Sequence, residues 1–212
     1  MTADFGGLHR APLQVTAGGA VALLHDAAGV RGYSALRQQI VPVPAVPASS
    51  DVGGVLAYVE TQATGDVFVF DGRTAGWHAA PPGTAAAQPM LTATTLGLAT
   101  ATETWAFASA AGGFVPLGGP SNGLAGNPMS APLLAWNGAV LAAFDDRLAR
   151  WVTTPRTSAA TPVFRGWRTA VIALDGATAH GYGAQAGAWH ATPLPAGSAS
   201  SYANSEVGYV VT

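Results

Sequence analysis

The sequence predicts an all-β protein built from one repeated unit, and three observations carry that prediction. A large aromatic residue recurs in steps of 37, 37, 37 and 38 residues, at Tyr33, Phe70, Phe107, Phe144 and Tyr182. A second large apolar residue follows each aromatic seven positions later, at Ile40, Trp77, Phe114, Trp151 and Trp189. Short polar or Gly-containing turns separate the two positions, as in Asp71-Gly72-Arg73-Thr74. This combination is typical of a tandemly repeated β-hairpin.

Two further strands precede each hairpin in the predicted unit. Apolar runs lie at Val21–Leu24, Val55–Val59, Leu96–Ala99, Leu133–Trp136, Val171–Leu174 and Val207–Val211. Upstream of them are stretches of small residues, at Gln14–Gly19, Ala48–Asp51, Leu91–Thr95, Pro128–Ala131, Pro162–Trp167 and Ser198–Asn204. We therefore predict about 37 residues and four short strands per unit: a small inner strand, an apolar second, an aromatic third and an outer fourth. The repeats show no helical periodicity, and Gly and Pro are too frequent for long helices.

The two ends of the chain complement each other. Residues 198–212 supply an inner and a second strand, and residues 2–13 supply a third and a fourth strand joined by Gly6-Gly7. We therefore predict that residues 1–212 form a single domain, a six-bladed β-propeller whose ring is closed by N- and C-terminal strands sharing one blade. Such closure would remove exposed sheet edges. Five or seven blades, or a two-layer sandwich, are the structural alternatives.

The segment Asp66–Pro82 resembles the second half of a kelch repeat. Phe70 stands before the hairpin, Asp71 within it, and Trp77 opens the outer strand. The kelch diglycine occurs only at Gly18-Gly19 and Gly53-Gly54. The chain therefore resembles a degenerate kelch-like propeller, and the resemblance implies a fold without implying a function.

Composition narrows the classes of function. Only 9% of residues are charged, the net charge is −2, and all nine basic residues are Arg. This balance argues against a nucleic-acid partner and against a polybasic membrane-binding surface. The chain has no cysteine, which excludes disulfides and thiolate chemistry. Residues 1–19 lack the pattern of a signal peptide, and the uncharged runs are interrupted by Gly, Pro, Ser and Asn, so we expect no membrane span.

Departures from the repeat indicate a candidate ligand site. The inner strands consist mostly of small residues, but the fifth carries Arg165 and Trp167, the sixth carries Tyr202 and Asn204, and the second ends at Asp51. If these side chains converge at one mouth of the axial channel, they suit a glycan, a carboxylate or a phosphate. The alternative is that Arg165 and Asp51 are solvated or paired and that the aromatic residues plug the channel.

A second candidate surface is the charged hairpin of the fourth unit. Asp145, Asp146, Arg147 and Arg150 lie there, with Arg156 shortly after, and this patch is a candidate contact for a protein partner. The alternative is an ordinary solvated turn. The aromatic residues at the second repeat position, such as Trp77, are expected to pack between neighbouring blades.

Motifs for catalysis and for metal binding are weak. Residues 119–123 match the string G-x-S-x-G, but they lie in a Gly/Pro loop rather than at a strand-to-helix elbow. His9, His78 and His190 share one repeat position, which favours a structural role, and His25-Asp26 follows an apolar strand. We predict no catalytic residues, no metal and no cofactor.

The sequence thus predicts a non-catalytic binding or scaffold propeller whose partner is an unidentified protein, small molecule or glycan. A glycan or small-anion binder at the axial mouth is the first alternative. A propeller hydrolase or lyase is the second.

Overall fold

The computed structural model describes residues 13–27, 29–85, 87–127, 132–167, 169–196, 200–203 and 208–211. The chain divides into two compact units, Met1–Ala80 and Pro81–Thr212, and each is described by itself. Every regular element in the described residues is a β-strand, which confirms the all-β class. No helix in that part of the chain is long and apolar enough to cross a membrane. That residues 1–212 form a single domain stays a prediction.

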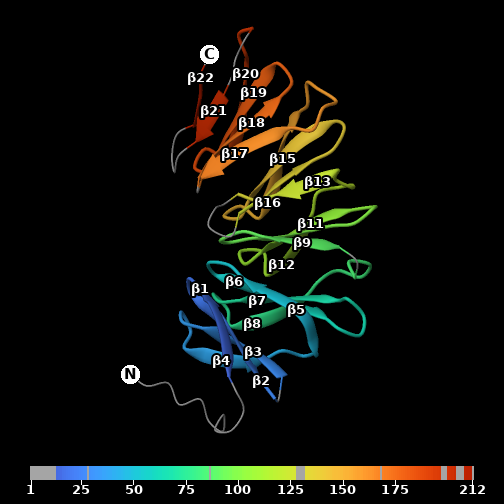
Figure 1. Cartoon of the computed structure of the whole chain (residues 1–212), viewed down its shortest axis with the longest axis vertical. Helices are drawn as coiled ribbons and strands as arrows, with labels where there is room; N and C mark the ends of the chain where they lie inside the picture. The colour runs from blue at the N-terminus through green and yellow to red at the C-terminus, as the bar shows by residue number, and fades with distance from the viewer. Residues whose placement is uncertain are drawn as a thin grey trace. The chain divides into compact units, whose positions relative to one another are not determined.

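Two four-stranded antiparallel sheets form the first unit (Figure 1). The first sheet contains β1 (Gln14–Gly18), β2 (Val21–Asp26), β3 (Gly29–Ser34) and β4 (Gln39–Pro42). The second sheet contains β5 (Pro47–Val52), β6 (Leu56–Thr61), β7 (Val67–Asp71) and β8 (Gly76–Ala79). Each strand pairs with the next along the chain, which is the up-and-down order of a propeller blade.

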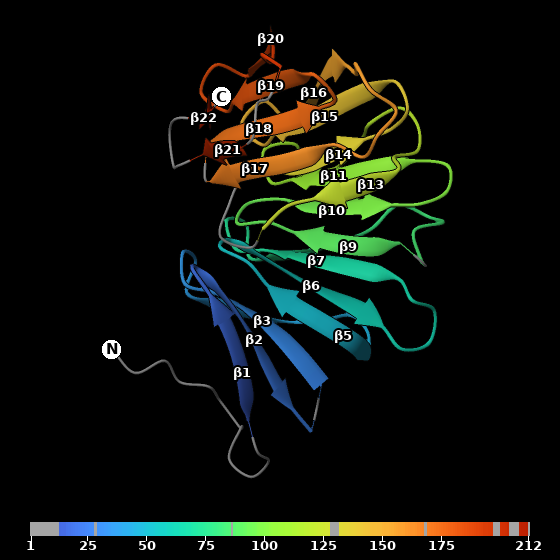
Figure 2. The same cartoon turned by 45° about the horizontal axis from the view of Figure 1, so that its top comes forward.

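The second unit repeats this order in three more sheets. The third sheet contains β9 (Gln88–Leu91), β10 (Leu96–Ala99), β11 (Thr104–Ala108) and β12 (Gly113–Pro116). The fourth contains β13 (Gly123–Ala125), β14 (Leu134–Trp136), β15 (Val140–Asp145) and β16 (Arg150–Pro155). The fifth contains β17 (Val163–Trp167), β18 (Ala170–Asp175), β19 (Thr178–Gly183) and β20 (Ala188–Pro193). The third, fourth and fifth sheets follow one another in chain order, as the successive positions of β9, β13 and β17 show (Figure 2).

The last described strands form a two-stranded sheet of β21 (Ser200–Ala203) and β22 (Gly208–Val211), which neighbours β17 and β18. The described residues therefore contain five complete four-stranded sheets and one two-stranded sheet rather than six complete blades. Residues 2–13 were predicted to complete the sixth blade, and residues 2–12 lie outside the described residues. Neither the sixth complete blade nor the closed ring is shown.

In each four-stranded sheet, the two large residues that recur in the sequence repeat lie directly opposite each other on the third and fourth strands. The pairs are Tyr33 with Ile40, Phe70 with Trp77, Phe107 with Phe114, Phe144 with Trp151 and Tyr182 with Trp189. The centroids of the four aromatic pairs are 5.1–5.3 Å apart, in tilted or edge-to-face geometry. This geometry is favourable for aromatic rings. The repeat in the sequence therefore arises because the same contact between the third and fourth strands recurs in every four-stranded sheet.

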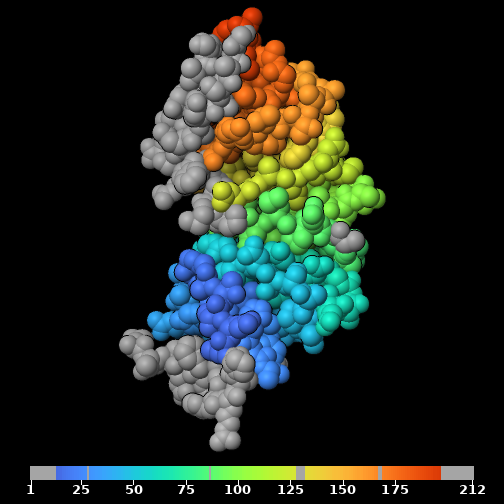
Figure 3. Space-filling model, in the orientation of Figure 1, coloured from blue at the N-terminus to red at the C-terminus, as the bar shows by residue number. Residues whose placement is uncertain are grey.

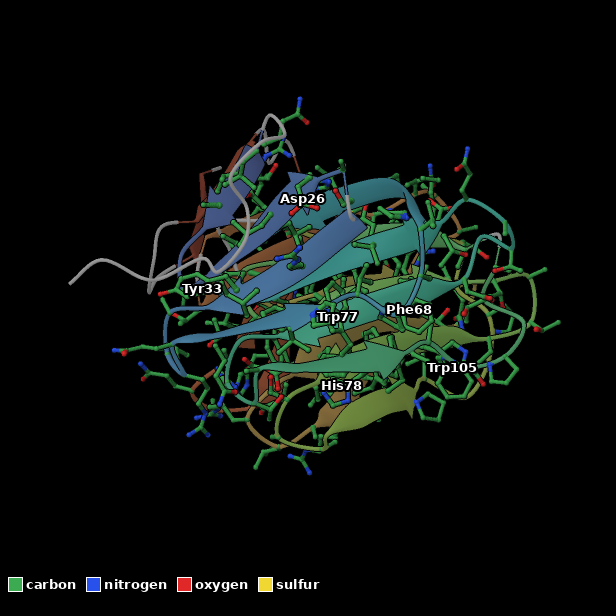
Figure 4. All side chains as sticks on the ribbon, turned by 90° about the horizontal axis from the view of Figure 1, so that it is seen from below. Asp26, Tyr33, Phe68, Trp77, His78 and Trp105 are labelled. Carbon is green, nitrogen blue, oxygen red and sulfur yellow. The ribbon has the colours of Figure 1, made fainter. Side chains whose placement is uncertain are left out.

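The two sheets of the first unit pack face to face. Their shared core joins Val21, Leu23 and Val30 of the first sheet to Val59 and Phe70 of the second. Figure 4 labels Phe68 and Trp77 on neighbouring strands of the second sheet and Tyr33 on the first sheet.

The two diglycines meet where these sheets are closest. The Ala20 N–H donates to the Gly54 carbonyl at 2.6 Å. A Cβ at Gly18 or Gly19 would overlap the carbonyls of Gly53 and Gly54. The close approach of two backbones therefore requires glycine there.

Tryptophans of the outer strands also connect neighbouring sheets. The indole N–H of Trp77 donates to the Val41 carbonyl at 3.2 Å, and that of Trp151 donates to the Val115 carbonyl at 3.2 Å. Trp189 makes the equivalent bond to the Val152 carbonyl at 2.9 Å. Each bond joins a sheet to the sheet before it, as expected from the repeat.

The five hairpins between third and fourth strands share one backbone feature. The second residue before the repeat-locked Ile, Trp or Phe has a positive φ in every hairpin: Gln38 (55°), Ala75 (55°), Gly112 (65°), Ala149 (49°) and Gly187 (60°). This left-handed conformation favours glycine, yet three hairpins use another residue.

Two inner strands lie elsewhere than the sequence predicts. The third inner strand is β9 and not Leu91–Thr95, because residues 92–95 form a turn. In that turn the Thr92 N–H donates to the Thr95 carbonyl at 2.8 Å, and the Thr92 hydroxyl accepts from the Thr95 N–H at 3.0 Å. The fourth inner strand is β13, and the predicted stretch 128–131 lies outside the described residues.

Candidate functional site

Most of the predicted ligand site falls on two neighbouring strands of the second unit. Arg165 lies on β17, is exposed, and donates from one terminal nitrogen to the Phe164 carbonyl at 3.0 Å. Trp167 is the last residue of β17, Tyr202 lies on β21, and these two strands are neighbours. Asn204 lies outside the described residues. The structure thus brings Arg165, Trp167 and Tyr202 onto adjacent strands.

Asp51 belongs to the first unit. It is an exposed residue of β5 opposite Tyr58 on β6, and its carboxylate accepts from the Val52 N–H at 2.8 Å. Burial raises the pKa of the Tyr58 phenol, and the carboxylates of Asp51 and Glu60 raise it further. Asp51 therefore has local partners, and its membership of the ligand site stays a prediction.

The charged hairpin of the fourth sheet is held in one conformation by Asp145. The side chain of Asp145 is buried, and its Oδ1 accepts from the N–H groups of Arg147 at 3.1 Å and Leu148 at 3.3 Å. Arg147 also pairs with Asp145 Oδ2 at 3.4 Å. A terminal guanidinium nitrogen of Arg147 donates to the Ala184 carbonyl at 2.5 Å and to the Gln185 carbonyl at 3.3 Å. Asp145, one of the predicted contact residues, is therefore buried and stabilises the conformation of the hairpin.

The exposed part of the same hairpin is amphipathic. Arg147 and Arg150 are exposed, and Asp146 is half-buried. Between the two arginines lies Leu148, which is 55% exposed. Leu148 was not predicted as a contact residue, although a large aliphatic residue within a charged turn is visible in the sequence.

Arg156 does not belong to this exposed patch, contrary to the sequence prediction. Its side chain is 3% exposed and forms an ion pair with Asp175, 0% exposed, at 2.6 Å. The guanidinium also donates to the carbonyls of Asn137, at 3.0 Å, and Ala160. Burial disfavours ionised Asp175, but the hydrogen bonds from Arg156 and from the N–H of Thr157 outweigh it and lower its pKa. Arg156 therefore connects the fourth sheet to the fifth.

Glu103, which is half-buried, forms a second anchor that the sequence did not indicate. Its Oε1 accepts from the N–H groups of Thr104 at 2.9 Å, Gly118 at 3.0 Å and Gly119 at 2.8 Å. Burial would raise the pKa of this carboxyl, but the hydrogen bonds from these N–H groups lower it. The carboxylate fixes the loop that leads from the third sheet to the fourth.

That loop contains the string G-x-S-x-G. Residues 119–122 lie in the loop between β12 and β13, as expected, and Gly123 begins β13. The Ser121 hydroxyl accepts from the Thr104 hydroxyl at 2.9 Å. The strand-to-helix elbow of a nucleophilic serine does not occur in this described loop.

His180 is a buried polar residue that was not predicted from the sequence. It lies two positions before the repeat-locked Tyr182 on the same face of β19, and the two residues are 1% and 2% exposed. Tyr182 packs against Leu134 and Ala143 of the fourth sheet. Burial, with a further contribution from Asp145, raises the pKa of Tyr182 to about 12. Within the described residues, neither imidazole nitrogen nor the phenol oxygen has a hydrogen-bond partner. The sequence did contain a signal for His180, because no other repeat has a histidine at this position. The equivalent residues are Arg31, Phe68, Trp105 and Ala142.

The other histidines do not converge. His25 lies on β2, and His78 and His190 are the third residues of β8 and β20, as their shared repeat position predicts. Across the described ranges, no group of three or more His, Asp or Glu side chains is arranged to hold a metal ion.

Comparisons with known proteins assign no family. No protein-family model matches the chain, and no curated protein matches it. Among solved structures, the chain is similar to Hsv2 of Kluyveromyces marxianus, with a TM-score of 0.39, 10% identity, and coverage of 78% of this chain and 57% of the other. It is similar to PorZ of Porphyromonas gingivalis, a surface component of the type-IX secretion system, with a TM-score of 0.37, 12% identity, and coverage of 98% and 27%.

Hsv2 of Kluyveromyces lactis gives a TM-score of 0.37 at 9% identity, with 81% of this chain and 60% of the other covered. The chain thus spans 57%, 27% and 60% of the lengths of these three structures. At TM-scores of 0.39 or less and identities of 12% or less, these likenesses assign neither a family nor a function.

Proposed function

We propose that this chain is a non-catalytic binding module that contacts a protein partner through the hairpin between β15 and β16. The observation that carries the proposal is Leu148, which is 55% exposed on a hairpin held in place by Asp145 and Arg147. An apolar side chain on a rigid turn loses little conformational entropy on binding. Arg147, Arg150 and Asp146 around it supply the polar rim typical of protein interfaces.

The state of the carboxylates also favours binding over catalysis. Asp145, Asp175 and Glu103 are each engaged by backbone N–H groups, and the first two are also engaged by arginines. Hydrogen bonds lower the pKa of Asp175 and of Glu103 against the opposing effect of burial, whereas a general acid near neutral pH requires a raised pKa. These groups stabilise the fold, and they do not fit the acid of a hydrolase or lyase.

The experiment compares two matched leucine variants. Leu36 lies in the equivalent hairpin of the first sheet and is 57% exposed, so Leu36→Asp introduces the same change outside the proposed contact. Proteins captured by the wild-type chain are purified, and their binding to all three chains is titrated. We expect Leu148→Asp to weaken binding at least about fivefold, because truncating a central contact residue costs more than about 1 kcal/mol. Equal binding by both variants would refute the proposed surface.

A glycan or a small anion at Arg165, Trp167 and Tyr202 is the second candidate. The observation in its favour is that β17 and β21 are neighbours, with Arg165 exposed on β17. Asp51 and Asn204 complete the proposed set. A thermal-shift screen with glycans, carboxylates and phosphates tests it: a ligand at about 100 times its Kd stabilises by roughly 2.7 kcal/mol. A shift that survives Arg165→Ala would overturn the assignment.

We also propose that the repeats are kelch-like and that six blades close into a ring. The facing diglycines of the first two sheets support the kelch-like assignment. Support for closure comes from Tyr33, which is half-buried on the first sheet, whereas its four equivalents are at most 2% exposed. A sixth blade of residues 2–13 with β21 and β22 would cover that face. Deletion of residues 208–212 should then lower the free energy of unfolding by several kcal/mol, and an unchanged midpoint would contradict closure.

A further inference from the structure

The contact surface between the fourth and fifth sheets contains a buried histidine at a repeat position that is occupied elsewhere by Phe68, Trp105, Ala142 and the half-buried Arg31. We call this surface the seam; its core includes Leu134, Ala143, Val171 and Tyr182. The yellow fourth sheet and the orange fifth sheet meet along it in the space-filling view (Figure 3). His180 lies on the same face of β19 as Tyr182, flanked by Ala173 on β18 and Ala191 on β20. The side chain is therefore enclosed by small residues within its own sheet.

The environment of His180 accommodates only the neutral imidazole. His180 is 1% exposed, and neither ring nitrogen has a hydrogen-bond partner in the described part of the chain. A neutral imidazole there loses its hydrogen bonds to water. A protonated ring would also bring two donors and a full charge into an apolar contact, which costs far more free energy.

The charged groups around the seam do not compensate a protonated ring. On β18, Asp175 is the carboxylate that influences His180, but it is already bonded to Arg156 and to the Thr157 N–H. From the fourth sheet, Asp145 is bonded to Arg147, and the remaining cations are Arg150 and Arg156. On β19, the only other titratable group on this face is Tyr182. On β17 and β20 this face carries Phe164, Trp189 and Ala191, and no titratable group.

We propose that His180 makes the seam acid-sensitive: protonation of its imidazole weakens the packing of the fifth sheet against the fourth. Burial lowers the pKa of His180 in the folded chain below its ordinary value of 6.5, and the Asp175 carboxylate opposes this only in part. The unfolded chain therefore binds the proton first as the pH falls. The contribution of neutral His180 to the free energy of unfolding is therefore fully present above pH 6.5. It is lost progressively as the pH falls from 6.5 to the pKa of His180 in the folded chain.

The test measures the equilibrium constant of unfolding in urea at pH 7.5 and pH 5.0. Protonation of His180 in the unfolded chain raises this constant about tenfold for each pH unit below 6.5, as long as the folded imidazole stays neutral. The contribution of His180 therefore reaches at most about thirtyfold at pH 5.0. His180→Leu should lose this part of the pH dependence. His190→Gln, which alters an exposed histidine on the neighbouring strand, should keep it. An identical pH dependence in the wild type and His180→Leu would overturn the proposal.

Two measurements on the wild-type chain do not depend on how the variants fold. The ring resonances of ¹³C-labelled histidines should show that the pKa of His180 lies below 6.5, because burial disfavours the charged ring; a midpoint at or above 6.5 for His180 would overturn the proposal. Hydrogen exchange, corrected for intrinsic rates, should show β18–β20 opening more at pH 5 than the strands of the first unit. Uniform opening of both units would locate the acid sensitivity elsewhere.

Discussion

Replacement of Arg156 by alanine should cost more stability than any other arginine substitution in the described chain. Asp175 is 0% exposed and would keep its bonds from Thr157 and Ser158, but it would lose both bonds from the guanidinium, at 2.6 and 3.1 Å. The carbonyls of Asn137 and Ala160 would also lose their donor. Removing one partner of a buried ion pair costs about 3–5 kcal/mol, because the remaining charge is uncompensated. For a chain of this length, that lowers Tm by about 10 °C.

Urea unfolding followed by tryptophan fluorescence measures this loss. Arg73→Ala is the matched control, because Arg73 is exposed in a hairpin and should cost within about 0.5 kcal/mol. Asp175→Asn keeps the side-chain shape and should cost less than Arg156→Ala. Because hydrogen bonds lower the pKa of Asp175 below 3.8, its contribution is present above pH 3.8 and is lost as the pH falls toward the folded-state pKa. A cost below about 1 kcal/mol for Arg156→Ala would refute the assignment of this pair as the anchor between the two sheets.

Two further substitutions test the repeat itself. Gly112→Ala should cost only about 1 kcal/mol, because φ is +65° but the space around it is open; Gly187→Ala should cost more, because its Cβ would lie 3.0 Å from Asp145 Oδ2. Equal costs in urea unfolding would contradict this account. Trp151→Phe should cost about 1–2 kcal/mol through loss of the 3.2 Å bond to the Val115 carbonyl, although the ring contact is kept, and an unchanged midpoint would show that the bond contributes nothing.

The repeat could be predicted because it reflects packing. Phe70 and Trp77 have to face each other on adjacent strands, so their spacing is constrained and visible in the sequence. The apolar second strands were predictable for the same reason: Leu96–Ala99 matches β10 residue for residue. The inner strand β9 was not predictable, because the threonine-rich turn at residues 92–95 has the same small-residue composition as an inner strand.

The candidate sites were less predictable, because the sequence does not show which charges are buried. Asp145 and Arg147 lie two positions apart in a charged run, yet Asp145 is buried and Arg147 is largely exposed. Arg156 belongs to the same run by spacing, but its partner Asp175 is 19 residues away. Burial of a charge depends on the neighbouring sheet, and that information is absent from a local pattern.

The bonds between neighbouring sheets recur at nearly the same separation as the repeat. Trp77 to Val41, Trp151 to Val115 and Trp189 to Val152 span 36, 36 and 37 residues, and Arg147 to Ala184 spans 37. Within each compact unit, neighbouring sheets are therefore held together at equivalent positions, and the stability of such an array is approximately a sum of sheet and nearest-neighbour terms. In such an array, a weakened seam releases one sheet without requiring the others to rearrange. Arg156, Asp175 and His180 all lie at the seam between the fourth and fifth sheets, so this contact combines a strong ionic anchor with a group that destabilises it in acid.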